Sequence, residues 1–425
     1  MKFREPLTLT ENLGEVMNKA ITLLFPRSEF LLNETTFPPL GILYLASVLK
    51  IQDYEVQCLD FGLGHTIDDI QHQIVGISFT TPQRLQVYDI VKTLKQKGKF
   101  LIAGGAHPTH MPIECIENGF DIVVRGEADY HLPIILKEHF NRLSKPQIYS
   151  PCEPKKIDVI PFPDRNALPI KDYHYAIDDR PSTVVMTSRG CYANCSFCAK
   201  VTCRFRVQSA QRTVDELFHI RDKYGFTAFM IFDDVFAVHK KRLYEIADLM
   251  RNEDFKFRCF GRADSLADES ICETLARMGV VEVGIGVESG SDVVLSQNFK
   301  NTTSELNSIA VTNLKKQGIR VKCFIIVGLP GESVETIEDT RNWLKRNKPD
   351  DVDISIFQPM PGSPIFKDPS RYDVVFTYDH NPMWYKGVPE KYTTSVTRSG
   401  KLLAREIIYY RNQLESEFKK KELLR

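Results

Sequence analysis

The sequence predicts an α/β protein in which a Rossmann-like, doubly wound parallel sheet is followed by a partial (β/α)6 barrel. Three observations predict this arrangement. Short apolar runs alternate with amphipathic stretches over residues 18–140, the same alternation returns in six units from Thr183 onward, and a proline-dense stretch separates the two regions. Alternating strands and helices favour parallel sheets, because the crossover between two parallel strands is usually a helix.

Composition limits the class of protein. The 425 residues are 43% hydrophobic and 26% charged, as in a soluble globular protein of two or three domains. Lys and Arg number 55, as do Asp and Glu, so net charge gives no argument for a nucleic-acid or anionic-membrane partner. The sequence contains no run of 18 apolar residues, so we expect no membrane span, and Met1 to Glu15 is too polar for a signal peptide. Mostly isolated cysteines fit a reducing, cytoplasmic compartment.

The first domain is expected over residues 1–145. Its expected helices are Gly41–Lys50 and Leu85–Lys97, and its expected strands are Ala20–Phe25, Tyr54–Asp60, Ile74–Thr80, Phe100–Gly104 and Asp121–Val124. Glycines such as Gly104, Gly105 and Gly126 follow these strands. Ligands of open α/β sheets bind at the carboxyl ends of the strands, so these loops are candidate binding loops.

A linker is expected over residues 146–181, because seven prolines fall there and leave little periodic pattern. The barrel is expected over residues 182–365, with helices such as Thr213–Tyr224, Lys240–Arg251 and Ser333–Arg346. Its expected strands are Thr183–Thr187, Ala228–Phe232, Lys256–Phe260, Val281–Gly286, Arg320–Val327 and Val352–Phe357. Residues 366–425, with Trp384, Tyr385 and an expected helix Ser399–Lys421, are expected to cap the barrel or its side.

Three cysteines on one short loop carry the clearest chemical signal. Cys191, Cys195 and Cys198 have the spacing C-x3-C-x2-C and follow the first barrel strand, where such barrels place their chemistry. Three thiolates can hold three irons of a [4Fe–4S] cluster and leave the fourth iron open to a ligand. The alternative is a structural zinc site with Cys203 as fourth ligand, although zinc sites more often use two separated pairs.

The cysteine loop, with the aromatic Phe197 directly before its last cysteine, resembles the signature of the radical S-adenosylmethionine (SAM) enzymes. The resemblance extends in order over residues 180–365. It implies that the open iron chelates the amino and carboxylate groups of SAM, and that one electron cleaves SAM to methionine and a 5′-deoxyadenosyl radical. It also implies Phe197 as a cofactor-site residue and a flavodoxin or ferredoxin as the reductant.

Two acidic motifs end barrel strands. Asp233 and Asp234 follow the second expected strand, where they can accept hydrogen bonds from the SAM amino group or from a substrate; the alternative is a helix N-cap. Glu288 and Ser289 follow the fourth. A carboxylate there can bind both ribose hydroxyls, as acidic residues do in dinucleotide sites, so Glu288 is the expected ribose ligand with Ser289 beside it. The alternative for Glu288 is a surface salt bridge.

A glycine-rich turn follows the next strand. Gly328 and Gly331 lie in the stretch Ile326 to Glu332 and allow the backbone to approach an adenosyl group closely. An ordinary strand-to-helix turn would use the same residues. No catalytic acid or base is identified from the sequence.

The first domain resembles the cobalamin-binding domains that are fused to class B radical-SAM enzymes. The likeness is carried by Phe37 to Ala46, Gly104 to Thr109 and Arg125 to Glu127, and it implies cobalamin near Gly104 and Gly105. One departure matters: many such domains ligate cobalt through the histidine of a D-x-H-x-x-G loop, and here Asp60 is followed by Phe61-Gly62. His107 and His110 lie on an expected ligand-side loop, and each is either a cobalt ligand or a solvated residue.

The resemblance implies a cobalamin-dependent methyltransferase that acts on an unactivated carbon of a small biosynthetic intermediate. Two alternatives remain open. One is a cobalamin-independent adenosyl-radical dehydratase or other tailoring enzyme, in which the first domain would bind no corrin. The other is a non-catalytic iron–sulfur or zinc protein.

Overall fold

The computed structural model describes residues 19–29, 31–139, 146–202, 204–377, 395, 397–399 and 401–419. The chain forms two compact units. The first contains residues 39–152 and 160–169 together with the N-terminal residues up to Arg27, and the second contains residues 28–38, 153–159 and the chain from Ile170 onward. None of the helices in these ranges is long and apolar enough to cross a membrane.

The first unit is built on a six-stranded parallel sheet with the order β2-β1-β3-β4-β5-β6. The strands are β1 (Ala20–Phe25), β2 (Glu55–Asp60), β3 (Ile74–Ser78), β4 (Phe100–Gly104), β5 (Ile122–Val124) and β6 (Gln147–Tyr149). The order reverses direction next to β1, as in doubly wound folds, so the expected Rossmann-like sheet is confirmed. Such sheets bind ligands beyond the carboxyl ends of the strands at this reversal.

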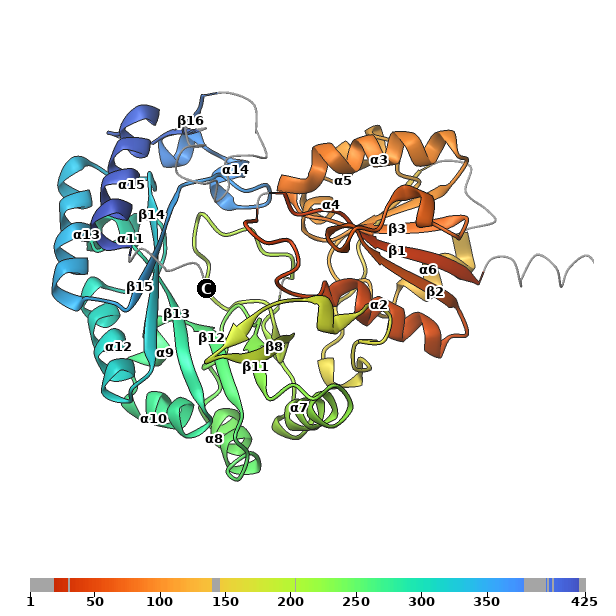
Figure 1. The fold of residues 1–425 in the computed structure, drawn as a ribbon. Helices are drawn as coiled ribbons and strands as arrows, with labels where there is room; N and C mark the ends of the chain where they lie inside the picture. Colours follow the sequence, from red (N-terminus) through yellow and green to blue (C-terminus); the bar gives the residue numbers. More distant parts are fainter. Residues whose placement is uncertain are drawn as a thin grey trace, which may run out of the picture. The chain divides into compact units, whose positions relative to one another are not determined.

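Helices cover this sheet because its strands are apolar on both sides. They are α2 (Leu40–Ile51), α3 (Arg84–Gln96), α4 (Ala106–His110), α5 (Pro112–Glu117) and α6 (Leu132–His139) (Figure 1). One core cluster joins Val87, Ile90 and Leu94 of α3 to the buried side chains of β3 and β4.

The proline-rich residues 146–181 are more ordered than a simple linker. They contain β6 in the first sheet and the short strand β7 (Ala176–Ile177) in the second. Residues 160–169 belong to the first unit, where the Asp164 side chain accepts a 2.6 Å bond from the Lys50 ammonium group. The chain therefore passes between the units more than once.

The second unit is built on a seven-stranded sheet with the order β15-β14-β13-β12-β11-β8-β7. Its six parallel strands follow one another in sequence: β8 (Arg180–Val185), β11 (Ala228–Ile231), β12 (Lys256–Gly261), β13 (Val280–Glu288), β14 (Arg320–Val327) and β15 (Asp351–Ile356). β7 pairs with β8 in the antiparallel sense and ends the sheet. The expected partial (β/α)6 barrel is confirmed.

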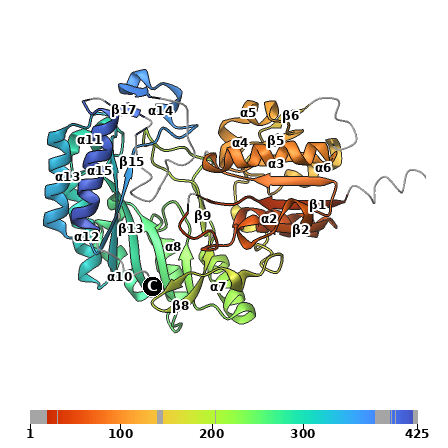
Figure 2. The ribbon, with the colours of Figure 1, turned by 45° about the horizontal axis from the view of Figure 1, so that its top comes forward.

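The helices of this unit lie on the outer face of the curved sheet (Figures 1 and 2). They are α7 (Ala210–Tyr224), α8 (Lys240–Leu249), α9 (Ala263–Leu266), α10 (Glu269–Arg277), α11 (Asp292–Gln297), α12 (Ser304–Lys316), α13 (Val334–Asn347) and α15 (Ala404–Phe418). The short helix α14 (Pro364–Lys367) instead packs beyond the ends of the strands, where Ile365 contacts the cluster of Leu329 and Phe357. The short strand pairs β9 (Ser188–Arg189) with β10 (Arg206–Val207), and β16 (Val374–Phe376) with β17 (Thr397–Ser399), complete the unit.

The last helix covers the side of the barrel. On α15, Ile407 belongs to the barrel core, and the Arg411 guanidinium donates a 3.0 Å bond to the carbonyl of Ile354 in β15. The helix thus buries an apolar side against the last strand. Trp384 and Tyr385 lie outside the described residues.

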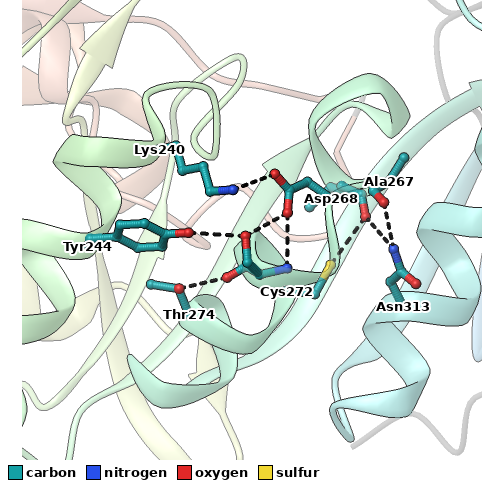
Figure 3. A network of polar contacts seen from close by, with 9 residues as sticks. Lys240, Tyr244, Ala267, Asp268, Cys272, Thr274 and Asn313 are labelled. Atoms are coloured by element: carbon teal, nitrogen blue, oxygen red, sulfur yellow. Dashed lines mark hydrogen bonds and ion pairs between the residues drawn. The ribbon is translucent and has the colours of Figure 1, made fainter.

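A polar network joins the outer helices α8, α10 and α12 (Figure 3). The Lys240 ammonium lies 2.7 Å from the Asp268 carboxylate, and the Tyr244 hydroxyl donates to Ser270 at 3.0 Å. The Asn313 amide donates to the carbonyl of Ala267 at 2.9 Å. These bonds lie on the outside of the barrel and fix the order of the helices around it.

Candidate functional site

The three cysteines lie on the loop that leaves β8 at its carboxyl end. Cys195 is buried, Cys191 is half-buried and Cys198 is exposed. Although the Cys198 residue keeps surface accessible to solvent, protein atoms around its thiol, followed by the charges of Cys195 and Asp234, raise the pKa of Cys198 to about 11. The Cys198 amide donates to the Cys195 carbonyl at 3.2 Å, so the loop turns back on itself between these two cysteines.

A cation lies beside these thiols. The Arg262 guanidinium, just after β12, donates to the Sγ of Cys195 at 3.7 Å and to the carbonyl of Lys300 at 2.7 Å. It also lies 5.5 Å from the ring centroid of Tyr192. A fixed positive charge stabilises thiolates, which are the ligand form of cysteine. Sequence reasoning missed this role of Arg262.

A single zinc ion and an iron–sulfur cluster require different arrangements of ligands. Within the described ranges, no three His, Cys, Asp or Glu side chains converge as the ligands of one ion would. Tetrahedral zinc requires such convergence, whereas the cysteines of a cluster each bind a different iron. Three cysteines on one loop match the number of protein ligands that a [4Fe–4S] cluster with one open iron requires. Cys203, the fourth ligand of the zinc alternative, lies outside the described residues.

Asn298, just after α11, holds the middle of the cysteine loop. It is fully buried, its side-chain oxygen accepts from the Ser196 hydroxyl at 3.0 Å, and its carbonyl accepts from the Ser196 amide at 3.0 Å. Its side-chain amide donates to the carbonyls of Val294 and Pro330 at 2.9 Å. One residue thus joins the cysteine loop to the glycine-rich turn after β14.

Replacing Asn298 with alanine is expected to loosen the cluster site. The change leaves buried polar groups of Ser196 and Pro330 without this partner, at a cost of about 1–3 kcal/mol. We expect faster loss of iron to a chelator from the reconstituted N298A protein. Asn313→Ala is the matched control, because Asn313 makes similar carbonyl bonds far from the loop. Equal iron-release rates in the two variants would contradict this role.

The two adjacent aspartates have different surroundings. Asp233 is buried, and its carboxylate accepts 2.6 Å bonds from the amide and the hydroxyl of Thr187 at the start of the cysteine loop. Asp234 is exposed by surface area and raises the pKa of both Cys191 and Cys198. Neither is a helix N-cap, since α8 begins at Lys240. Asp233 therefore anchors the loop, and Asp234 is the aspartate available to a ligand.

Glu288 ends β13 in an unusual conformation. Its φ is +65°, and the strand register shifts between Gly286 and Glu288. A non-glycine residue in the left-handed region is uncommon and is found more often at functional sites. Glu288 is buried, and its carboxylate accepts a 2.6 Å bond from the buried Lys300 ammonium. The salt bridge that the sequence offered as the alternative to a ribose ligand is thus present but buried, with a cation that sequence reasoning missed.

Gly286 makes room for this pair. A Cβ at Gly286 would lie 2.4 Å from the Glu288 carboxylate and 2.9 Å from the Lys300 nitrogen. By contrast, the neighbouring Ser289 is fully buried, and its hydroxyl lies 3.1 Å from the hydroxyl of Thr340 on α13. The structure places Ser289 against a helix, which does not support the expected contact between this hydroxyl and SAM.

Backbone conformation and crowding explain the glycines of the turn after β14. Gly328 and Gly331 have φ of +96° and +84°. A Cβ at Gly331 would collide with the Gln297 side chain, and one at Gly328 would lie 2.9 Å from Ile407. The buried Glu332 carboxylate accepts a bond from the Gly328 amide. The ordinary turn therefore explains both glycines, and an approach to adenosine stays a prediction.

Two further residues are placed at the strand ends. Phe197 is half-buried and packs against a cluster that contains Leu329, Phe357 and Ile365. Gln358, two residues after the end of β15, is 7% exposed, and neither polar atom of its carboxamide has a hydrogen-bond partner among the described contacts. An unsatisfied buried amide is costly, so a bound ligand would stabilise it.

In the first unit, the loop after β4 approaches β3 closely. Gly105 has a φ of +98°, and a Cβ there would lie 2.8 Å from the carbonyl oxygen of Phe79. Gly104 has open space at the same position. Only Gly104 therefore leaves room for a ligand at the end of β4, while Gly105 is required by the backbone.

His107 is neither a solvated residue nor a free ligand. It is 1% exposed; its Nε2 lies 2.9 Å from the Tyr88 hydroxyl and its Nδ1 lies 3.2 Å from the Thr81 hydroxyl. Burial lowers the pKa of His107 to about 3, so the ring is neutral. Both nitrogens are engaged, and His65 turns its Nδ1 to the Asp60 carbonyl at 2.8 Å. The His107 side chain is therefore not arranged as a cobalt ligand, whereas the bond of His65 involves Nδ1 alone.

Known proteins resemble both units. The B12 binding domain model matches residues 33–136, and the Radical SAM superfamily model matches residues 185–344. An uncharacterized methyltransferase of Pyrococcus horikoshii is 30% identical over 390 residues, which cover 82% of each chain. The anaerobic magnesium-protoporphyrin IX monomethyl ester cyclase of Rubrivivax gelatinosus is 25% identical over 88% of this chain and 73% of its own.

Two solved structures share the fold. The radical SAM methyltransferase TsrM of Kitasatospora setae, bound to tryptophan and a SAM analog, has a TM-score of 0.67 with 16% identity over 87% of this chain and 81% of its own. The cobalamin-dependent enzyme OxsB has a TM-score of 0.65 with 20% identity over 94% of this chain and 61% of its own. At these identities the likeness concerns the fold alone.

Proposed function

Because the chain belongs to the radical SAM superfamily and carries a B12-binding domain, we propose that it is a cobalamin-dependent methyltransferase that acts on an unactivated carbon of a small biosynthetic intermediate. The observation that carries this proposal is the cysteine loop after β8, which lies with Arg262 near the buried Glu288–Lys300 pair. When bound, the cluster supplies the electron that cleaves SAM, and the corrin carries the methyl group.

Each end of SAM has a complementary residue in the barrel. Asp234, beside the cysteines, is suited to accept from the amino group. Lys300 carries the positive charge that a carboxylate requires, and Glu288 has two oxygens for the ribose hydroxyls. The carboxamide of Gln358 has both a donor and an acceptor, which match the edge of adenine. These assignments leave Asp233 and Ser289 as supports of the site.

The first unit would hold cobalamin beyond the carboxyl ends of its strands, near Gly104. A cytoplasmic flavodoxin or ferredoxin is the proposed electron donor. The names of several relatives support methyl transfer, including a bacteriochlorophyllide d C-8(2)-methyltransferase of Chlorobaculum tepidum, which is 25% identical over 71% of this chain. The substrates of those proteins are not carried over.

Cobalamin is expected to bind without a protein histidine on cobalt, because no histidine lies two residues after Asp60 and both ring nitrogens of His107 are engaged elsewhere. The measurement is electron paramagnetic resonance of the Co(II) form after incubation with hydroxocobalamin and repurification. We expect retained corrin without nitrogen superhyperfine splitting from an imidazole. The H107F variant, which cannot ligate metal, should give the same spectrum. Imidazole splitting that disappears in this variant would contradict the structural role of His107.

If the repurified protein retains no corrin and still forms 5′-deoxyadenosine from SAM, the methyltransferase proposal fails. The corrin-independent dehydratase or tailoring enzyme would then be the better account. Failure to form 5′-deoxyadenosine with an intact cluster would instead favour a non-catalytic iron–sulfur protein.

A further inference from the structure

Four phenylalanine rings form a connected row in the second unit, which we call the aromatic platform: Phe37, Phe232, Phe260 and Phe324. Their ring centroids are 5.6 Å apart from Phe37 to Phe232, 6.2 Å from Phe232 to Phe260 and 5.8 Å from Phe260 to Phe324. Phe232 is 45% exposed and the other three are half-buried. Large apolar side chains that remain exposed to solvent in a folded protein often mark a binding surface.

The pleat of the strands places the rings of Phe260 and Phe324 on the inner face of the barrel. On β12, Phe257 and Cys259 belong to the core beneath the outer helices, and on β14, Cys323 and Ile325 do. Successive side chains of a strand point to opposite faces, so Phe260 and Phe324 face inward. The helices lie on the other face (Figure 1).

A glycine on β13 lets the two rings face the same space. Gly284 pairs with Phe260 in the register, and a Cβ at Gly284 would lie 2.8 Å from an atom of each of the Phe260 and Phe324 rings. Any other residue would push the rings apart. The inner face of β13 is therefore bare at the level of the platform.

The inner face below the platform is charged but internally paired. The Arg258 guanidinium lies 2.7 Å from the Glu282 carboxylate, and the Lys322 ammonium lies 2.7 Å from Asp351. Arg258 also contacts the hydroxyl of Tyr175, whose ring lies 4.6 Å from that of Phe37. Each of these charges is paired within the protein. This part of the inner face therefore does not favour binding of a charged group of a ligand.

The platform also lies next to the proposed SAM residues. Phe232 directly precedes Asp233 and Asp234 in the sequence. Phe324 pairs in the register with Gly286, which lies against the Glu288–Lys300 pair. Along β13 and β14, the aromatic platform thus lies between the paired charges and the proposed SAM residues.

We propose that the substrate carries a flat, conjugated ring system, and that its face rests on the aromatic platform. This inference rests on the proposed function, since it assigns the substrate class of the same site. Aromatic rings bind flat π-systems through offset and edge-to-face contacts that saturated rings of the same size cannot reproduce. Paired charges beneath the rings disfavour a charged group at the buried edge of the substrate, so its polar groups would remain toward the opening.

The test compares two four-ring carboxylates that differ in flatness: 1-pyrenebutyrate is flat and aromatic, and cholate is saturated. Their binding to the anaerobically reconstituted protein is measured by fluorescence titration and by calorimetry. We expect 1-pyrenebutyrate to bind at least about ten-fold more tightly than cholate. In F232L and F324L, which retain apolar bulk without the ring, its affinity should fall about five-fold.

Phe218→Leu is the matched control, because Phe218 packs against Phe255 on the outside of the barrel and should bind the probe as the wild type does. Equal affinity for the two probes, no binding of the flat probe, or unchanged affinity in F232L and F324L would overturn the substrate class. If any of these occurs while SAM is still cleaved, only this inference fails. Loss of both the cluster and SAM cleavage in the wild type would instead overturn the proposed function.

Discussion

Replacing Cys191, Cys195 or Cys198 with alanine is expected to abolish the iron–sulfur cluster. The wild-type protein should contain about four irons and four sulfides per chain after anaerobic reconstitution, because three thiolates on one loop hold three irons. Each alanine variant removes one of these ligands. The measurement is iron and sulfide content together with the broad visible absorbance. SAM cleavage should be lost in the same variants.

Two other cysteines serve as controls. Cys152→Ala removes an exposed thiol of the first unit, and Cys203→Ala removes the fourth ligand of the zinc alternative. Both variants should retain a full cluster. Stoichiometric zinc in the wild type, or loss of the metal in the Cys203 variant, would show that the loop is a zinc site.

Glu288→Gln should weaken SAM binding by about ten-fold or more while the cluster remains. The substitution keeps the shape of the side chain but removes charge-assisted hydrogen bonds to the ribose, which are worth roughly 1.5–3 kcal/mol. It also leaves the buried Lys300 ammonium without its 2.6 Å partner. Calorimetric titration of the reconstituted protein with SAM measures the effect.

Glu282→Gln is the control that distinguishes a loss of SAM binding from a loss of protein stability. Glu282 lies on the same strand, and it also pairs with a cation, Arg258, at 2.7 Å. Both variants should lower the melting temperature, because each leaves a cation without its carboxylate partner. Only E288Q should lose SAM affinity. Equal SAM affinities in the two variants would remove Glu288 from the site.

The long elements were predictable because each is a single uninterrupted pattern. The apolar runs of β1, β4 and β14 give strands with the expected bounds. The short helices α4, α5, α9, α11 and α14 were not predicted, since a helix of four to six residues is too short to show a period of 3.6. β13 runs to Glu288, two residues beyond its expected end, because the bulge near Gly286 continues the pairing.

The site was predictable where it is local in sequence. The cysteine spacing is contained in eight residues and required no knowledge of the fold. In each adjacent pair, one residue lies against the protein: Asp233 binds Thr187, and Ser289 lies against Thr340. A motif names both members of such a pair but cannot say which side chain packs against a neighbouring element of the protein. That choice depends on the strand's pleat and its neighbours.

Partners from distant positions could not be predicted. Lys300 is 12 residues from Glu288, beyond α11, and no periodic pattern links the two. Asn298 reaches Ser196 across 102 positions of the chain. Phe37 lies far before the barrel in the sequence, yet it belongs to the second unit. Its ring packs against the rings of Phe232 and Tyr175. Such contacts arise only when the chain folds.

The most direct test of the central claim is a single anaerobic turnover assay. The reconstituted protein is incubated with cobalamin, SAM and a low-potential reductant, and the quenched products are quantified by liquid chromatography and mass spectrometry. The account predicts both 5′-deoxyadenosine and S-adenosylhomocysteine, which report radical cleavage and methyl transfer, and it predicts that both are absent in C195A. Protein with a full cluster and bound corrin that forms neither product would contradict it.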